Sequence, residues 1–140
     1  MCSSDLAITK KNPFKKKSKT RLITRIKHAK KIVGVNKFIK IRFFEDKIKS
    51  NKTIDLINYM KKKNKKLNIY FIMGADNLIK FHKWNKWKDI TRLCKIIVFD
   101  RYGYKSKALS SIASKYMKKN NWKFVKFSKI NISSSQIRNI

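Results

Sequence analysis

The sequence has few of the residues that staple small domains or shape their turns: its 140 residues include two cysteines, one proline and three glycines. Cys2 and Cys94 are far apart and lie in no spacing typical of a metal or redox site, so we expect two free thiols in a reducing cytoplasm. Gly34, Gly74 and Gly103 are too scattered for a P-loop or a dinucleotide fingerprint. No apolar run approaches the ~20 residues of a membrane span. No continuous apolar segment near the start predicts a secretory signal.

Acidic residues are also scarce, because seven of them face 38 lysines and arginines and leave a net charge of +31. Such a balance usually indicates a polyanionic partner. However, the chain has 32 lysines and six arginines, and lysine, isoleucine and asparagine fill 64 positions. These residues have AT-rich codons, and arginine is the better reader of phosphates and base edges. We therefore favour a compositional bias and expect no specific nucleic-acid partner; a basic surface selected for binding is the alternative.

What the chain does contain is a globular composition, 42% apolar and 12% aromatic, in which helix and strand patterns alternate. The first helix carries Leu22, Ile26, Ala29 and Val33 at helical spacing and ends at Gly34. The pattern predicts further helices over residues 52–63, 86–94 and 106–119, and strands over 38–44, 68–73, 95–100 and 122–127. The continuous apolar run 68–73 is typical of a parallel strand covered by helices on both faces. We therefore predict one α/β domain with a mainly parallel sheet.

Ligands of open α/β sheets bind at the carboxyl ends of the strands. This rule selects Gly74-Ala75-Asp76, Asp100-Arg101 and the segment 131–138, "NISSSQIR". In the last segment, Ser133, Ser134 and Ser135 at a helix start form a candidate phosphate site, to which Arg138 would add a charged fork. An ordinary serine N-cap with a solvated arginine is the alternative.

The segment "GADNLIKFHKWNKW" (74–87) offers other candidates. Asp76 can accept hydrogen bonds from ribose hydroxyls or cap the following helix, and Gly74 would let a ligand approach the backbone. Trp84 and Trp87 are three residues apart, on one face if the segment is helical. One indole can stack on a flat cationic ring, whereas packing in the core is the usual role of such a pair. His28 and His82 have no metal-ligand partner at a suitable spacing, and no Ser-His-Asp or Cys-His arrangement is evident.

Taken in order, these motifs resemble the bacterial nicotinate-nucleotide adenylyltransferases. "FIMGADNLIKFHKWNKWKDI", "VFDRYGY" and "ISSSQIR" are similar to that family's strand with Gly-Ala-Asp, its W-x-x-W segment, its Arg-Pro-Gly and its I-S-S-[ST]-x-I-R. "KKNPFK" (10–15) resembles its Asn-Pro-Leu-Lys loop, and "KTIDLI" (52–57) its Thr-x-x-Thr-Leu helix start. The resemblance covers residues 7–140 and implies a Rossmann-like nucleotidyltransferase fold.

The resemblance also implies a reaction, the transfer of an adenylyl group from ATP to nicotinate mononucleotide with Mg²⁺ assisting. It assigns Ser133, Ser134, Ser135 and Arg138 to the ATP phosphates, Gly74 and Asp76 to the adenosine ribose, and Thr53 and Trp84 to the nicotinate nucleotide. The pyridinium ring of that nucleotide is cationic, which suits an indole face. Trp87 is expected to be a packing residue.

The sequence departs from the family pattern in three places. Leu56 replaces the second threonine, and Tyr102 replaces the proline after Arg101. The third departure is the absence of the Gly-x-Phe-Asp-Pro-x-His-x-Gly-His segment, whose two histidines face the nucleotide phosphates. We therefore expect an incomplete nucleotidyltransferase domain over residues 7–140 that lacks its first strand–helix unit, and an extraneous origin for residues 1–6, which match nothing in the family. Because the catalytic histidine pair is absent, we expect this chain alone to have little or no activity. The alternatives are an adenylyltransferase for another phosphorylated acceptor, such as phosphopantetheine, and a small basic nucleic-acid-binding protein.

Overall fold

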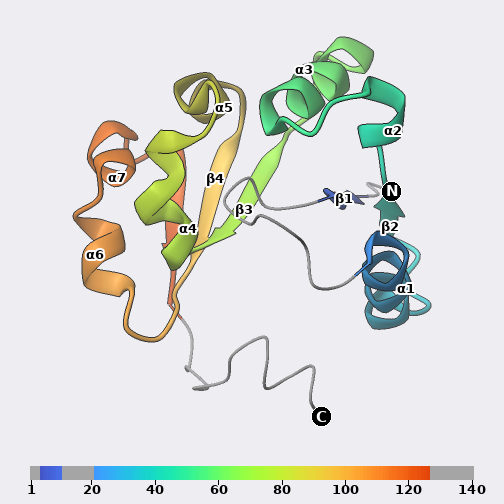
Figure 1. The fold of residues 1–140 in the computed structure, drawn as a ribbon, viewed down its shortest axis with the longest axis horizontal. Coiled ribbons are helices and arrows are strands. Elements are labelled where there is room, and N and C mark those ends of the chain that lie inside the picture. The colour runs from blue at the N-terminus through green and yellow to red at the C-terminus, as the bar shows by residue number, and fades with distance from the viewer. Residues whose placement is uncertain (1–3, 11–20, 127–140) are drawn as a thin grey trace. The chain divides into compact units, whose positions relative to one another are not determined.

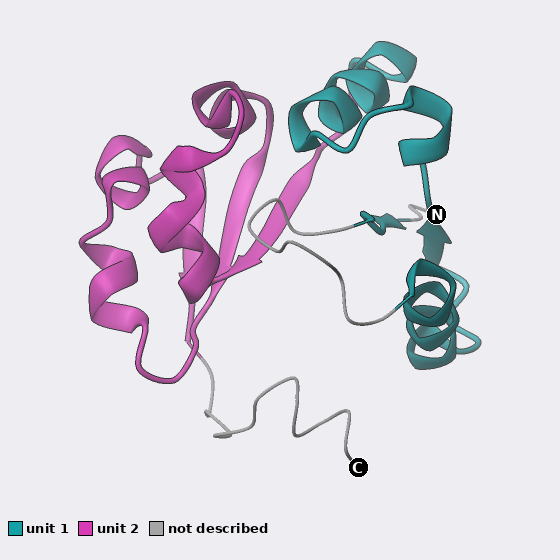
Figure 2. Cartoon of the chain, in the orientation of Figure 1, with its two compact units in different colours: residues 1–65 teal, residues 66–140 magenta. Residues whose placement is uncertain are grey.

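The computed structural model describes residues 4–10 and 21–126, which form two compact units, residues 1–65 and residues 66–140 (Figure 2). The loop resembling Asn-Pro-Leu-Lys, apart from Lys10, and the serine-rich segment lie outside the described residues. Each unit has its own parallel sheet, so the expected α/β class with parallel strands is confirmed. Assignment of residues 7–140 to a single domain stays a prediction.

The first unit contains a two-stranded parallel sheet. Its elements are β1 (Ser4–Ala7), α1 (Leu22–Val33), β2 (Ile39–Arg42), α2 (Glu45–Ile48) and α3 (Thr53–Lys63) (Figure 1). In the β1–β2 pair Ser4 lies opposite Ile39 and Ala7 opposite Arg42. Ser4, Asp5 and Leu6 thus form part of a paired strand, while the origin of residues 1–6 stays a prediction.

The predicted first helix is confirmed. Leu22, Ile26, Ala29 and Val33 are all partly buried, whereas Ile23 between them is largely exposed. The helix ends at Gly34, whose φ of 56° is in the left-handed region that glycine adopts without steric cost. Helical periodicity therefore identified both the element and its inward face.

Helices α1 and α2 anchor the chain where β1 ends. The main-chain N–H of Lys10 donates to Glu45 Oε2 at 2.8 Å, and the Glu45 side chain is almost fully buried. Arg25 donates from α1 to the carbonyls of Thr9 and Lys10. A buried carboxylate is costly unless its oxygens accept hydrogen bonds, and the Lys10 N–H provides one. These contacts fix residues 9 and 10.

The second unit is a three-stranded parallel sheet in the order β3-β4-β5. Its elements are β3 (Tyr70–Gly74), α4 (Ala75–Lys80), the 3₁₀ turn η1 (Phe81–Lys83), α5 (Trp87–Leu93), β4 (Lys95–Phe99), α6 (Lys105–Leu109), α7 (Ile112–Tyr116) and β5 (Trp122–Val125). Helix α4 packs on β3 and β4 and contacts α6 and α7 (Figure 1). Because the strands are parallel and in register, Gly74 lies opposite Phe99 and both strands end at the same edge.

The core of this unit lies on one face of the sheet. Met73, Ile96 and Val98 alternate with outward residues and are almost fully buried, together with Leu78 and Phe81 from the helical layer. On the opposite face the side chains of Tyr70 and Ile72 are each 53% exposed. The continuous apolar run therefore forms the expected parallel strand, with one face buried more deeply than the other.

Two local expectations are corrected by the structure. Residues 106–119 do not form one helix, because α6 ends at Leu109 and Ser111 starts α7 by accepting a hydrogen bond from the Ser114 N–H at 3.2 Å. The chain from Trp84 to Trp87 is also not a helical turn. Trp84 is extended, and Lys86 has a φ of 50° immediately before α5. In both places a helix stops and restarts within a few residues.

Candidate functional site

The carboxyl ends of β3 and β4 bring three charged side chains together. Asp76, the second residue of α4, accepts a hydrogen bond from Arg101, two residues beyond β4, with 2.7 Å between Arg101 Nη1 and Asp76 Oδ2. The Asp76 side chain is 26% exposed and that of Arg101 45%. Asp100, between β4 and Arg101, is almost fully buried. The sequence separates the paired residues by 25 positions, and the parallel β3–β4 pairing brings them together.

Gly74 leaves room for the Asp76 carboxylate. A Cβ at position 74 would lie 2.6 Å from Asp76 Oδ1, closer than real Cβ contacts come. The backbone of Gly74 is ordinary, with a φ of −81°, so the glycine is needed for space and not for a special conformation. The space where a side chain at position 74 would lie is taken by Asp76, and the expectation that Gly74 admits a ligand to the backbone stays a prediction. Asp76 is also not a helix cap, since Gly74 occupies that position.

The two oxygens of Asp76 have different surroundings. Oδ1 is buried and has no hydrogen-bond partner among the described residues, whereas Oδ2 bonds Arg101. Because Oδ1 is enclosed, the exposed part of the Asp76 side chain lies on its other atoms. A carboxylate oxygen carries two lone pairs, so Oδ2 keeps acceptor capacity after bonding Arg101.

The backbone of Arg101 is fixed on both sides. Its N–H donates to Asp100 Oδ1 at 2.8 Å, and its carbonyl accepts from the Tyr104 N–H at 3.0 Å. Asp100 is in turn tied to the sheet, because its N–H donates to the Val125 carbonyl at 2.9 Å. The guanidinium therefore extends from a main chain that β5 and the following turn hold in place.

Trp84 and Trp87 both pack on Phe81, which is fully buried. The ring centroids are 5.5 Å apart for Phe81 and Trp84 and 6.0 Å apart for Phe81 and Trp87, in edge-to-face arrangements. Trp84 also contacts Phe71 at 5.6 Å, and Trp87 contacts Tyr116 at 4.9 Å. Such pairs contribute about 0.5–1.5 kcal/mol beyond burial. Both indoles are thus packing residues, and a ligand role for the half-buried Trp84 stays a prediction.

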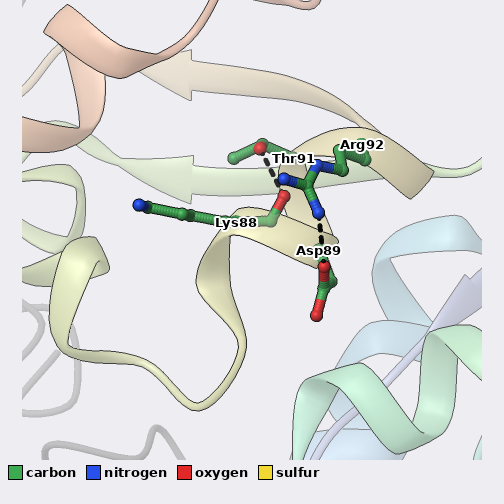
Figure 3. A network of polar contacts seen from close by, with 4 residues as sticks. All are labelled: Lys88, Asp89, Thr91 and Arg92. Atoms are coloured by element: carbon green, nitrogen blue, oxygen red, sulfur yellow. Dashed lines mark hydrogen bonds and ion pairs between the residues drawn. The ribbon is translucent and has the colours of Figure 1, made fainter.

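Helix α5 carries a second arginine–aspartate pair on its surface. Arg92 Nη1 lies 3.0 Å from Asp89 Oδ1, three residues earlier on the same helix (Figure 3). The Thr91 hydroxyl donates to the Lys88 carbonyl at 2.7 Å. This pair joins neighbouring turns of one helix, whereas the pair of Asp76 and Arg101 joins two strand ends. Its chemistry is the same, which makes it a matched control.

The remaining predicted site residues fall into two groups. Thr53 is the first residue of α3 in the first unit, while Gly74, Asp76 and Trp84 lie in the second. Ser133, Ser134, Ser135 and Arg138 lie outside the described residues. The structure therefore brings Gly74 and Asp76 together, and the joint site with Thr53 and the serines stays a prediction.

Within residues 4–10 and 21–126, no three side chains of histidine, cysteine, aspartate or glutamate gather in a way that could hold a metal ion. In the same ranges, no helix combines the length and apolar character required to cross a membrane.

Arg101 is the contributor that the sequence motifs left without a role. Its position after a buried strand was the available signal, because parallel strands end at one edge of a sheet. Its partner, Asp76, is assigned with Gly74 to the adenosine ribose, and the motifs give it no ion-pair partner. Only the order of β3 and β4 in the sheet makes the pair visible.

Comparison with known proteins agrees with this arrangement. The cytidylyltransferase-like family matches residues 5–140. This is the class of nucleotidyltransferases that the parallel sheet and its strand-end residues indicate. A probable nicotinate-nucleotide adenylyltransferase of Pelagibacter ubique is 62% identical over 134 residues, which cover 96% of this chain and 74% of that relative. The chain therefore belongs to the cytidylyltransferase-like family and, within it, to the nicotinate-nucleotide adenylyltransferases.

More distant relatives extend the comparison. A probable nicotinate-nucleotide adenylyltransferase of Bradyrhizobium sp. (strain ORS 278) is 32% identical over 108 residues, 77% of this chain and 56% of the relative. The chain thus spans about half to three quarters of the length of these curated relatives.

Two solved structures share the fold. The nicotinic acid mononucleotide adenylyltransferase of Plasmodium falciparum, complexed with APC, matches with a TM-score of 0.69 at 17% identity. The match covers 98% of this chain and 67% of that one. The same enzyme complexed with NaAD gives a TM-score of 0.63 at 15% identity, over 98% and 68% of the two chains.

Proposed function

We propose that the protein transfers the adenylyl group of ATP to nicotinate mononucleotide and so produces nicotinate adenine dinucleotide and pyrophosphate, a step of NAD biosynthesis. The observation that carries this proposal is the junction of β3 and β4. There Asp76 of the Gly-Ala-Asp motif lies beside Gly74 and pairs with Arg101. The chain is 62% identical to a probable nicotinate-nucleotide adenylyltransferase. We place the reaction in the cytoplasm, as its two substrates are soluble metabolites.

In this reaction a phosphate oxygen of nicotinate mononucleotide attacks the α-phosphorus of ATP. The bond from that phosphorus to the oxygen bridging to the β-phosphate breaks, and pyrophosphate leaves with the electron pair. The protein contributes alignment, for which about 7–11 kcal/mol is available, and donors that stabilise charge on the phosphates, at roughly 3–4 kcal/mol for a well-placed one.

The residues divide these tasks. Asp76, in the space left by Gly74, accepts hydrogen bonds from the adenosine ribose. Thr53 and Trp84 hold the nicotinate nucleotide, whose cationic ring suits an indole face. The phosphates of ATP are held by the hydroxyls and the guanidinium of Ser133, Ser134, Ser135 and Arg138.

Mg²⁺ is expected to arrive with ATP. The described residues present no cluster of three metal ligands. Mg²⁺ in such sites is commonly bound by substrate phosphates with one or two carboxylates, and it keeps several waters. The residues present fit this arrangement better than a protein cage. When bound, the ion neutralises charge on the transferred phosphate and on the leaving pyrophosphate.

The test is substrate binding measured by isothermal titration calorimetry. We expect the chain to bind a non-hydrolysable ATP analogue and nicotinate mononucleotide, and Trp84→Ala to weaken the second ligand about tenfold, the scale of one lost cation–π stack. Trp87→Ala, the matched control, should lower the melting temperature without a selective loss of the nicotinate nucleotide. Binding of phosphopantetheine in place of nicotinate mononucleotide would favour the alternative acceptor and reject the proposal.

Catalytic turnover is expected to require residues beyond those that bind the substrates. The sequence contains only His28 and His82 and no H-x-G-H spacing. We therefore expect binding by this chain without measurable nicotinate adenine dinucleotide, and product formation would show that the histidine pair is dispensable.

A further inference from the structure

We propose that Arg101 is a positioning residue of the nucleotide site, which acts on the ribose of ATP through Asp76 and not by touching the ligand itself. The inference rests on the proposed function, in which the Asp76 carboxylate accepts a ribose hydroxyl. It adds the residue that sets the orientation of this carboxylate.

Both oxygens of the Asp76 carboxylate are held in place. Asp76 Oδ1 is enclosed beside Gly74, where a side chain would come within 2.6 Å of it. Oδ2 accepts a hydrogen bond from Arg101 Nη1 at 2.7 Å. One oxygen is thus fixed by packing and the other by an ion pair. The carboxylate has a single orientation, with the free lone pair of Oδ2 available for a hydroxyl.

The main chain of Arg101 is held rigidly. Its N–H and carbonyl are both bonded, to the nearly buried Asp100 and to Tyr104. A surface ion pair between two mobile side chains usually contributes little, because ordering both of them costs entropy. Here the main chain on which the guanidinium is mounted is already ordered. The pair therefore acts on geometry more than on stability.

Arg101 also neutralises the charge of Asp76 beside the ATP phosphates. ATP is a polyanion, and an unpaired carboxylate beside it would repel the phosphates. A guanidinium 2.7 Å from the carboxylate cancels much of this field at close range. Asp76 can therefore select the ribose hydroxyls without weakening attraction for the phosphates. The ligand chemistry recognised here is a ribose diol attached to a polyphosphate.

The experiment is a cycle that combines protein variants with ligand variants. Binding of ATP and of 2′-deoxy-ATP and 3′-deoxy-ATP is measured by calorimetry for the unmodified chain, Arg101→Met and Asp76→Asn. We expect Arg101→Met to weaken ATP binding about tenfold, a loss of about 1.4 kcal/mol in binding free energy. With the deoxynucleotide that lacks the bonded hydroxyl, the loss should shrink to about threefold or less, because the contact that Arg101 positions is then missing.

Two further variants separate positioning from a merely structural role. Arg101→Lys keeps the charge but not the planar fork, so it should recover part of the affinity for ATP and restore the discrimination against the deoxynucleotide. Arg92→Met removes a more exposed arginine, 66% against 45%, that pairs with Asp89 on α5. It should change neither the affinity for ATP nor the discrimination against the deoxynucleotide. Circular dichroism and melting temperatures of all variants report folding. An arginine-to-methionine variant that misfolds is replaced by the lysine variant at the same position.

Each outcome decides something. Equal losses for ATP and both deoxynucleotides would mean that Arg101 acts on the phosphates, by contact or by charge alone, and not on the ribose through Asp76, which overturns the inference while leaving the proposed function intact. Unchanged affinity in Arg101→Met would overturn it as well. Failure of the unmodified chain to bind ATP would reject the proposed function and the inference together.

Discussion

At the scale of single residues, Gly74 has a role that differs from the usual one of a glycine. Its φ of −81° suits any residue, and what it provides is space for the Asp76 carboxylate. Gly103 presents the opposite case, with a φ of 79° and nothing within 4 Å of an added Cβ. The two positions therefore separate steric and conformational reasons for glycine within one unit.

We predict that Gly74→Ala lowers nucleotide affinity with little loss of stability. The added methyl group displaces a flexible carboxylate end and breaks an exposed ion pair, which contributes about 0–1 kcal/mol to the free energy of unfolding. Gly103→Ala should do the reverse, because a left-handed φ costs a residue with a side chain roughly 1–2 kcal/mol while the binding residues stay in place. Urea unfolding and calorimetry measure the two effects. A stability loss in Gly74→Ala larger than that in Gly103→Ala would contradict this account of the space beside Gly74.

At the scale of elements, the break between α6 and α7 depends on one serine. Ser111 Oγ accepts the Ser114 N–H at 3.2 Å, and the Ser114 hydroxyl donates to the Leu109 carbonyl at 2.8 Å. Neighbouring Ser110 instead donates to the Ser106 carbonyl at 3.0 Å and is exposed. Two adjacent serines thus have different functions, a cap and a bond back to the preceding helix.

We predict that Ser111→Ala lowers the free energy of unfolding by about 1 kcal/mol, the usual effect of losing an N-cap. Ser111→Asp, which keeps a capping oxygen, should retain most of it. Ser110→Ala is the matched control and should change stability by less than about 0.5 kcal/mol, since an exposed back-bonding serine contributes little to a helix. Equal losses from Ser110→Ala and Ser111→Ala in urea unfolding would show that α7 does not depend on this cap.

The same elements show what the sequence could predict. Periodicity identified α1 and its inward face, and alternation or continuous apolar runs identified β2, β3, β4 and β5. Helical periodicity failed to predict the break within residues 106–119. A cap formed by Ser111 interrupts an otherwise regular helical pattern there, and spacing alone does not show which serine turns inward. Spacing also suggested a helical turn between Trp84 and Trp87. The two indoles do share a neighbour, but they reach it from either side of a break at Lys86.

The candidate site was predictable to a different extent. The rule that ligands bind where strands end selected both Asp76 and Arg101. It did not predict that they pair, because the pairing requires β3 and β4 to be neighbours and Oδ1 of Asp76 to turn toward Gly74. Sequence motifs name the residues of such a site more readily than the contacts among them.

At the scale of the whole molecule, the charge of +31 still requires an explanation. The described arginines are largely engaged within the protein. Arg25 bonds main-chain carbonyls, while Arg42, Arg92 and Arg101 pair with aspartates. The excess charge is therefore carried by lysines, which bind phosphates as point charges and read base edges less well than arginine does.

We accordingly predict that the chain binds duplex DNA only through this nonspecific charge. Affinity for a short labelled duplex, measured by fluorescence anisotropy, should fall steeply between roughly 50 and 200 mM salt, with a log–log slope of about −0.9 for each phosphate neutralised. Because four of the five arginines in the described part of the chain are already bonded within the protein, a duplex of scrambled sequence should bind equally well. ATP affinity, which depends on a few placed contacts, should fall much less over the same range. Binding that persists at 200 mM salt and prefers one duplex sequence would instead assign the basic surface to nucleic-acid recognition.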